Sequence, residues 1–190
     1  IWSPSATVPA ATVVGTDGNS GTSSAQLQVG TGQNIFLQQN SVAAGTVADG
    51  DQIDISFFIK GTLEAGAVLQ TSASWEAGTT NLITPDGSAA PLIDNTSASD
   101  WTEYTFSATL TGGNLANGFS LQLQLVCGGA AGCNGDILID DISLAVTPAG
   151  GGGGGGTFDG GEISNGSFET GDLTNWGDPA PGAGTVTVVD

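Results

Sequence analysis

Basic side chains are almost absent from this 190-residue sequence, which contains one Lys or Arg, no His and 19 Asp or Glu residues. The formal net charge at pH 7 is −18, and Lys60 is the one basic residue. Binding to nucleic acid needs several Lys or Arg side chains against the phosphates, so this class of function is excluded. The same charge excludes attraction to an anionic membrane surface.

Long apolar runs are also missing. No stretch approaches the ~20 apolar residues that a membrane-spanning helix needs, so we expect no membrane insertion. The N-terminus has neither an initiator Met nor a signal-type segment. We therefore expect a mature, processed chain or a fragment of a longer one.

The groups that usually perform covalent or acid–base catalysis are scarce. Without His and Arg, a nucleophile with its base, or an oxyanion clamp, has few candidates. Paired carboxylates could hydrolyse glycosides, but most Asp residues lie beside Gly in turn-like clusters, where Asp bonds to the backbone. We therefore expect that the protein is not an enzyme.

The sequence has two cysteines, Cys127 and Cys133. Five mostly small or turn-forming residues separate them, which suits a disulfide across a hairpin, and two free thiols are the alternative. A zinc site would need two more thiolates or histidines. A disulfide in a chain rich in Ser, Thr and Gly indicates a secreted protein, extracellular or at the cell surface.

Alternation of apolar and polar residues with a period of two recurs along the chain, and no stretch shows a convincing helical period. In the last alternating stretch, Leu138, Asp140, Ile142 and Leu144 fall on one face. Clusters of Gly, Asn and Asp separate these stretches, which are residues 25–29, 53–60, 104–110, 119–125 and 138–146. The pattern predicts an all-β fold, an antiparallel β-sandwich of the jelly-roll type.

One segment breaks this pattern, because residues 150–156 are seven consecutive glycines. Composition favours a flexible linker, and a tract held in place by an assembly is the alternative. We divide the chain into residues 1–149, which form the sandwich, a Gly-rich linker over 150–162, and a C-terminal segment over 163–190.

Four blocks of the sequence resemble the carbohydrate-binding jelly rolls of the family 4/9/22 type, which are galactose-binding-like sandwiches. "NGSFETGDLTNW" resembles their opening strand and first turn, and "GTDGNSGTSSAQLQV" resembles the block that follows. "DWTEYTFSATL" resembles their middle strand, and "GDILIDDISL" resembles their closing strand. The resemblance implies this fold over nearly the whole chain, and it is much less specific to sugar binding.

The order of these blocks departs from the family pattern, because the opening block follows the closing one. The two ends of the chain also match each other. Trp2 and Trp176 each begin a Pro/Ala/Gly-rich turn, then a Thr/Val strand, then an Asp about fifteen residues on. Chance similarity of two low-complexity tails is the alternative. We expect a sandwich that lacks its first strand, with Ile163 and Phe168 in a C-terminal donor strand.

An open sheet edge is a template for another strand. The C-terminal segment could complete its own domain as a permuted monomer, enter a neighbouring molecule as a donor strand, or belong to a covalent tandem array. Head-to-tail exchange between copies generates an open filament unless the rotation closes into a ring. The main hypothesis is a structural subunit of an extracellular filament or repeat array. The alternative is a secreted carbohydrate-binding module with a polysaccharide partner.

The family resemblance also implies a structural Ca²⁺ where the first and last strands meet. Its ligands would be Glu169 and Asp140, with a contribution near Asp17 and with Asp141 as a second candidate. The residues agree, because a carboxylate on the apolar face of a strand is costly unless it is paired or metal-bound. The alternative is that Asp140 lies at a strand end and accepts backbone hydrogen bonds. If a neighbouring copy supplied Glu169, assembly would depend on calcium.

Sugar binding needs exposed aromatic rings and amide side chains. We expect the aromatic residues between positions 101 and 106 to lie in the core. Phe58 and Trp75 then remain as candidate contacts for a ligand or a partner. The amide side chains that could line one sheet face are those of Gln26, Gln28, Gln122 and Gln124.

Overall fold

The computed structural model describes residues 12–75, 92–94, 97–111, 116–149, 163, 166–173, 176 and 188–189. The strands are β1 (Thr12–Val14), β2 (Ser24–Gly30), β3 (Asn34–Val42), β4 (Gln52–Glu64), β5 (Ala67–Trp75), β6 (Leu92–Asp94), β7 (Ser97–Thr109), β8 (Phe119–Cys127), β9 (Asn134–Thr147) and β10 (Val188–Val189). These ranges contain no helix long and apolar enough to cross a membrane. The all-β prediction is confirmed.

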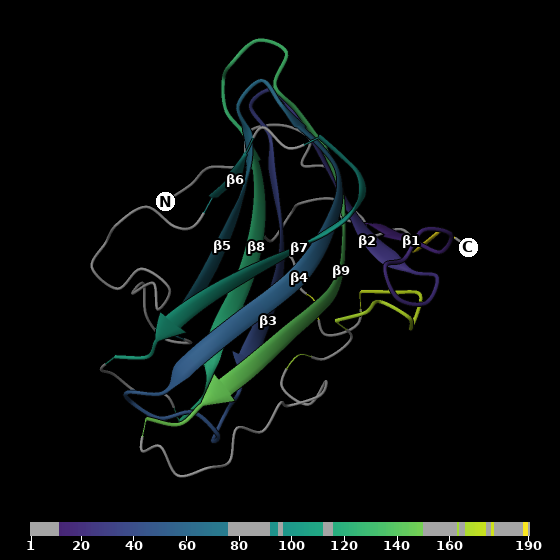
Figure 1. Ribbon diagram of the computed structural model, residues 1–190. Coiled ribbons are helices and arrows are strands. Elements are labelled where there is room, and N and C mark those ends of the chain that lie inside the picture. The colour runs from purple at the N-terminus through teal and green to yellow at the C-terminus, as the bar shows by residue number, and fades with distance from the viewer. Residues whose placement is uncertain are drawn as a thin grey trace.

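The strands form two sheets that pack face to face (Figure 1). The larger sheet has the order β10-β1-β2-β9-β4-β7, and the smaller has the order β3-β8-β5-β6. All neighbouring strands are antiparallel except β10, which lies parallel to β1 at the edge of the larger sheet. The predicted β-sandwich is therefore correct.

The core lies between the sheets because one residue in two along each strand is apolar and points inward. In β8, for example, Leu121, Leu123 and Leu125 are fully buried while the residues between them are half-buried. On the facing sheet, the ring of Phe57 stacks on Tyr104 and Phe106 with centroids 6.4 and 5.9 Å apart. Each fully buried Leu, Ile or Phe side chain stabilises the fold by ~1.5–3 kcal/mol relative to an exposed one.

A β-bulge in β9 changes the predicted alternation. Ser56 pairs with Ser143 and Phe58 pairs with Asp140, so two residues of β9 stand opposite Phe57 alone. Asp141 adopts a positive φ of 48° there. The prediction that Leu138 shares a face with Ile142 is therefore wrong, because the extra residue shifts the inward positions by one.

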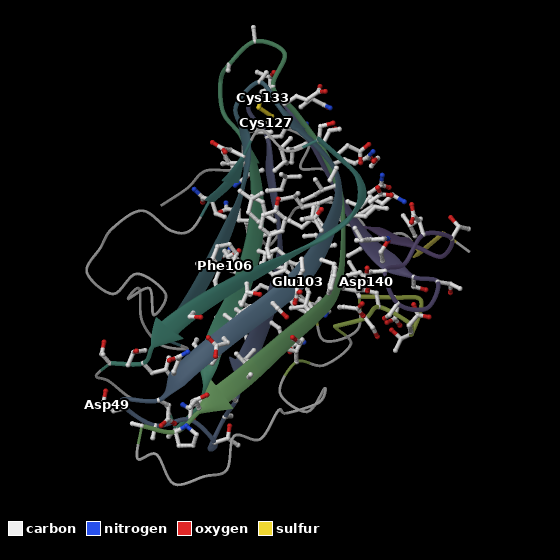
Figure 2. All side chains as sticks on the ribbon, viewed as in Figure 1. Asp49, Glu103, Phe106, Cys127, Cys133 and Asp140 are labelled. Atoms are coloured by element: carbon white, nitrogen blue, oxygen red, sulfur yellow. A yellow bond between two sulfur atoms is a disulfide. The ribbon has the colours of Figure 1, made fainter. Side chains whose placement is uncertain are left out.

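The predicted disulfide joins Cys127 and Cys133, whose Cα atoms are 5.8 Å apart. It closes the connection between β8 and β9 at one end of the sandwich (Figure 2). The loop between β2 and β3 fastens to the same place, because the Gly32 N–H donates to the Gly128 carbonyl oxygen at 2.9 Å. Since both cysteines are buried, the disulfide anchors this end to the core.

Candidate functional site

Asp140 lies in the bulge of β9 and is fully buried. Its Oδ2 accepts hydrogen bonds from the backbone N–H groups of Asn19 (2.6 Å) and Ser20 (3.2 Å), and its Oδ1 accepts one from Asp141 (2.7 Å). Burial raises the pKa of Asp140 to about 6, and the charge of Asp141 also raises it, while the three hydrogen bonds lower it in part. The carboxylate thus holds the loop of residues 15–23 against β9.

Glu169 holds the same loop from the other side. Its Oε1 accepts hydrogen bonds from the backbone N–H groups of Thr22 (2.9 Å) and Ser23 (2.7 Å). Gly21 has a φ of +67°, and a Cβ atom added there would lie 2.4 Å from Cδ of Glu169. This position therefore needs glycine, both for its backbone conformation and for the space that Glu169 occupies.

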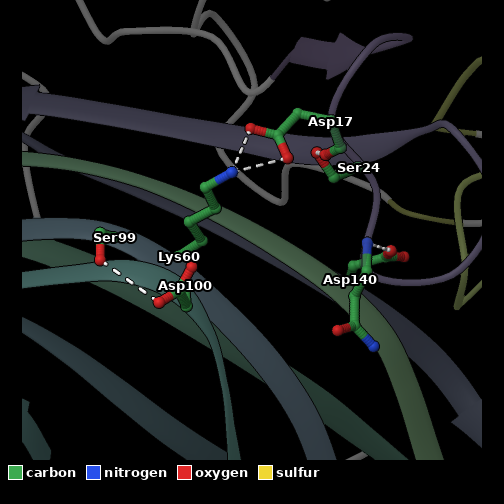
Figure 3. A network of polar contacts seen from close by, with 7 residues as sticks. Asp17, Ser24, Lys60, Ser99, Asp100 and Asp140 are labelled. Atoms are coloured by element: carbon green, nitrogen blue, oxygen red, sulfur yellow. Dashed lines mark hydrogen bonds and ion pairs between the residues drawn. The ribbon is translucent and has the colours of Figure 1, made fainter.

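The other two predicted ligands point to different partners. Asp141 accepts hydrogen bonds from the side chains of Asn19 and Ser20. Asp17 forms an ion pair with Lys60, at 2.7 Å between Oδ2 and Nζ (Figure 3). The Lys60 ammonium also lies 6.0 Å from the ring centroid of Trp101. The one basic residue of the chain therefore pairs with Asp17 and not with Asp140.

The four predicted carboxylates do not gather into one cluster in the arrangement observed. Within the described ranges, no three Asp, Glu, His or Cys side chains come together as a group that could hold a metal ion. Hydrogen-bond donors face both carboxylate oxygens of Asp140 and Oε1 of Glu169, whereas calcium needs six to eight oxygen ligands. Asp140 accepts backbone hydrogen bonds, as in the alternative interpretation, although it lies within β9. Calcium binding stays a prediction.

The outer face of the smaller sheet is a second candidate site. Three of its four strands, β3, β5 and β8, contain no charged residue, although the chain carries a net charge of −18, and Asp94 of β6 lies opposite Val68 at the edge of this face. On this face Phe36, Gln124 and Gln70 form one row across three strands, and Gln38, Gln122 and Ser72 form the next. We call this surface the amide face; it consists of Asn34, Phe36, Gln38, Asn40, Val68, Gln70, Ser72, Ser120, Gln122, Gln124 and Val126.

The central amides of this face are available for a ligand. Within the described part of the chain, no hydrogen-bond partner is found for the side chains of Gln70, Gln122 and Gln124. Gln38 differs, because its Nε2 donates to Asn40 Oδ1 at 2.6 Å. At the disulfide end the face opens into a cavity of about 380 Å³, whose lining residues include Gln33, Asn34, Gln70, Gln124, Val126 and Gly128.

The structure separates the predicted contact residues. Gln122 and Gln124 lie on the amide face, whereas Phe58 lies on β4 in the other sheet, half-buried and paired with Glu103 of β7. Trp75 is the last residue of β5, and its side chain lies outside the described part of the chain.

The prediction that Gln26 and Gln28 share a face with the glutamines of β8 is wrong. They belong to β2 in the larger sheet, and both donate hydrogen bonds to Asp136 at 3.0 Å. Alternation in the sequence tells which residues share one face of a strand, but it does not tell which sheet the strand joins.

Phe36 and Gln70 complete the amide face and were not predicted from the sequence. Each lies in an alternating stretch, "NIFLQQ" and "AVLQTSAS", so its outward position could have been inferred from the period of two. Their position beside Gln124 depends on the strand order β3-β8-β5, which has no local signal in the sequence.

No protein-family model matches the sequence, and no curated protein matches it. Among solved structures, the chain is similar to a family 16 carbohydrate-binding module (17% identity, 70% of this chain and 82% of that one, TM-score 0.44). It is similar to a CBM4 structure (15% identity, 70% and 92%, TM-score 0.44). It is also similar to the CBM22-1 xylan-binding domain of Paenibacillus barcinonensis Xyn10C (17% identity, 72% and 80%, TM-score 0.39). The structural similarity to CBM4, CBM16 and CBM22 modules concerns the β-sandwich fold alone.

Proposed function

We propose that this chain is a secreted binding module that takes a neutral polysaccharide on its amide face. The observation that carries the proposal is the set of central amides of Gln70, Gln122 and Gln124 without partners, on strands that bear no charge. A primary amide both donates and accepts hydrogen bonds, which matches the hydroxyl groups of a sugar. Because the rest of the molecule is anionic, an acidic polymer would be repelled.

The spacing of these groups favours a polymer over a single sugar. Neighbouring strands lie ~4.8 Å apart, and outward residues on one strand follow each other at ~6.7 Å, so the polar groups form a regular grid. A polysaccharide presents hydroxyl groups at a regular repeat and could contact several rows at once. Among the residues of the amide face, Phe36 alone is aromatic. Because a single ring offers little stacking surface, hydrogen bonds would carry most of the affinity.

Isothermal titration with soluble neutral β-glucan and xylan tests the proposal, with polygalacturonate as the acidic comparison. We expect neutral chains to bind and the acidic chain not to bind. Gln70→Ala with Gln124→Ala should weaken binding about 30-fold, since each lost hydrogen bond costs ~1 kcal/mol.

Gln28→Ala is the matched control, because this glutamine lies on the other sheet and donates to Asp136. It should leave the affinity unchanged. Failure of all neutral polysaccharides to bind, or an equal loss in Gln28→Ala, would reject the proposal.

A second candidate function is a structural subunit of an extracellular filament or repeat array. Ile163 and Phe168 motivate it, because both are buried in the core of their own chain and a filament would make the same contacts between copies. Electron microscopy and light scattering of the concentrated protein test this function. Polymers many copies long are expected, and their absence at millimolar concentration would reject it.

A further inference from the structure

The C-terminal segment supplies part of the hydrophobic core. Phe168 is fully buried, and Ile163 and Trp176 keep only 4% and 7% of their surface exposed. The rings of Phe168 and Trp176 lie 5.9 Å apart. The segment passes beside β9, near β2 (Figure 1). The sandwich therefore has a hydrophobic site that this segment fills.

Polar contacts anchor the segment at two places on the sandwich. The bulge of β9 offers the Ile142 N–H, which donates to the Gly166 carbonyl oxygen at 3.0 Å. A Cβ atom on Gly166 would lie 2.2 Å from the backbone oxygen of Ile142, so the backbone of the segment approaches that of β9 closely there. The loop of residues 15–23 binds Glu169, as described above. Any copy of this sandwich presents the same surface to the segment.

The sequence of strand β1 also occurs a second time, near the C-terminus. Residues 12–14 and 187–189 have the same sequence, Thr-Val-Val. β10 lies beside β1 in parallel, with Val13 opposite Val188 and Val14 opposite Val189, so equivalent residues of the repeat face each other. β2 has room for one of these strands, and β1 occupies that position. β10 thus repeats the sequence of β1, but within this chain the position beside β2 is already taken by β1.

The linker is long enough to reach another molecule. Thirteen residues separate Ala149 from Ile163, and the fourteen Cα–Cα steps between these two residues span up to ~48 Å when extended. A domain of 149 residues has a radius of gyration of only ~15 Å. Nine of the residues between 150 and 162 are glycines, which lack a side chain that could obstruct the crossing.

We propose that the described part of the C-terminal segment of one copy (residues 163, 166–173, 176 and 188–189) docks on the sandwich of a second copy. Phe168 and Glu169 would take the positions that they hold here, and β10 (Val188–Val189) would take the position of β1 beside β2 of that copy. The contact is heterologous, so it joins copies head to tail. The inference rests on the docking contact that the second candidate function uses, but it is broader than that function, because a closed pair of exchanged chains would also satisfy it.

Two complementary variants test the exchange. Gly166→Val places a side chain against the Ile142 backbone oxygen and disables the segment as a donor. Gly21→Asp places a carboxylate against that of Glu169 and disables the sandwich as an acceptor. Each variant alone should stay at the mass of one chain, 18.6 kDa. In a mixture, the intact segment of the second variant can dock on the intact sandwich of the first. Light scattering should then show a one-to-one complex of twice this mass.

Gly45→Asp is the control, because Gly45 has a similar φ of +75° and no atom within 4 Å of an added Cβ. It should keep the mass of the wild type, and any fall in its melting temperature measures the cost of a side chain at a positive φ alone. If the mixture of the two complementary variants stays at one-chain mass at 0.5 mM (about the upper end of ordinary titrations), the exchange is rejected. If a variant does not fold, wild-type chains refolded together at high concentration decide the matter, and one-chain mass alone rejects the exchange.

Failure of the exchange can be distinguished from failure of the filament function. A complex in the mixture, together with wild-type chains that form only closed pairs, supports the exchange and rejects the filament function. Polysaccharide binding is tested separately on the amide face, so it does not depend on either result.

Discussion

Truncation of one side chain tests whether the C-terminal segment belongs to the core. Phe168 is fully buried and packs beside Trp176. Its backbone has a φ of +55°, which is unfavourable for both Phe and Ala, so this strain cancels in the comparison. Truncation of a core Phe to Ala costs ~3–5 kcal/mol, which for a chain of this size lowers the melting temperature by roughly 6–20 °C. We expect Phe168→Ala to fall in this range.

The assay is thermal and denaturant unfolding of the full chain, with Phe36→Ala as the control. Phe36 is half-buried on the amide face, so its truncation should cost less than ~1.5 kcal/mol. Hydrogen exchange at the Ile142 amide gives a second readout, because this N–H donates to Gly166 and exchanges faster when the segment leaves. A loss within ~0.5 kcal/mol for Phe168→Ala, equal to that of a surface change, would refute the docking of the segment.

Three further predictions concern charge, redox state and metal. Because the pKa of Asp140 is raised from 3.8 to about 6, the folded state binds this proton more tightly than the unfolded chain. Protonated Asp140 therefore adds up to ~3 kcal/mol to the free energy of unfolding. This contribution is fully present below about pH 4 and is lost as the pH rises through about 6. Asp140→Asn should lack this slope in the free energy of unfolding, and an unchanged slope would contradict the assignment. Replacement of Cys127 and Cys133 by Ala should cost ~2 kcal/mol, as expected for a short closed loop, in equilibrium unfolding. If Asp140 and Glu169 bind calcium, CaCl₂ should raise the melting temperature more than MgCl₂ does, and an equal effect of the two salts would reject the predicted site.

The layers of the fold could be predicted from the sequence because each strand carries its own signal. The leucines of β8 alternate with Ser and Gln, and every leucine is buried while the residues between them face outward. The two cysteines lie at a spacing that a hairpin can close, and they are bonded. In both cases the information lies within a few neighbouring residues.

The remaining features depend on contacts between distant residues. The bulge in β9 is set by its pairing with β4, since two residues must stand opposite Phe57, and "DILIDDISL" alone does not show this. Lys60 and Asp17 are 43 positions apart, so their ion pair follows from the packing of the loop on the sheet. The assignment of Gln26 and Gln122 to different sheets likewise follows from the strand order. Alternation does not contain this order.

The absence of charge on strands β3, β5 and β8 also has a practical consequence for purification. A partner held by glutamine amides releases no counter-ions when it binds, so its retention should not weaken as sodium chloride is added. Chromatography on a neutral polysaccharide matrix would then require competing free sugar for elution. The acidic remainder of the molecule would allow the same protein to be captured first on an anion exchanger and released from it by salt.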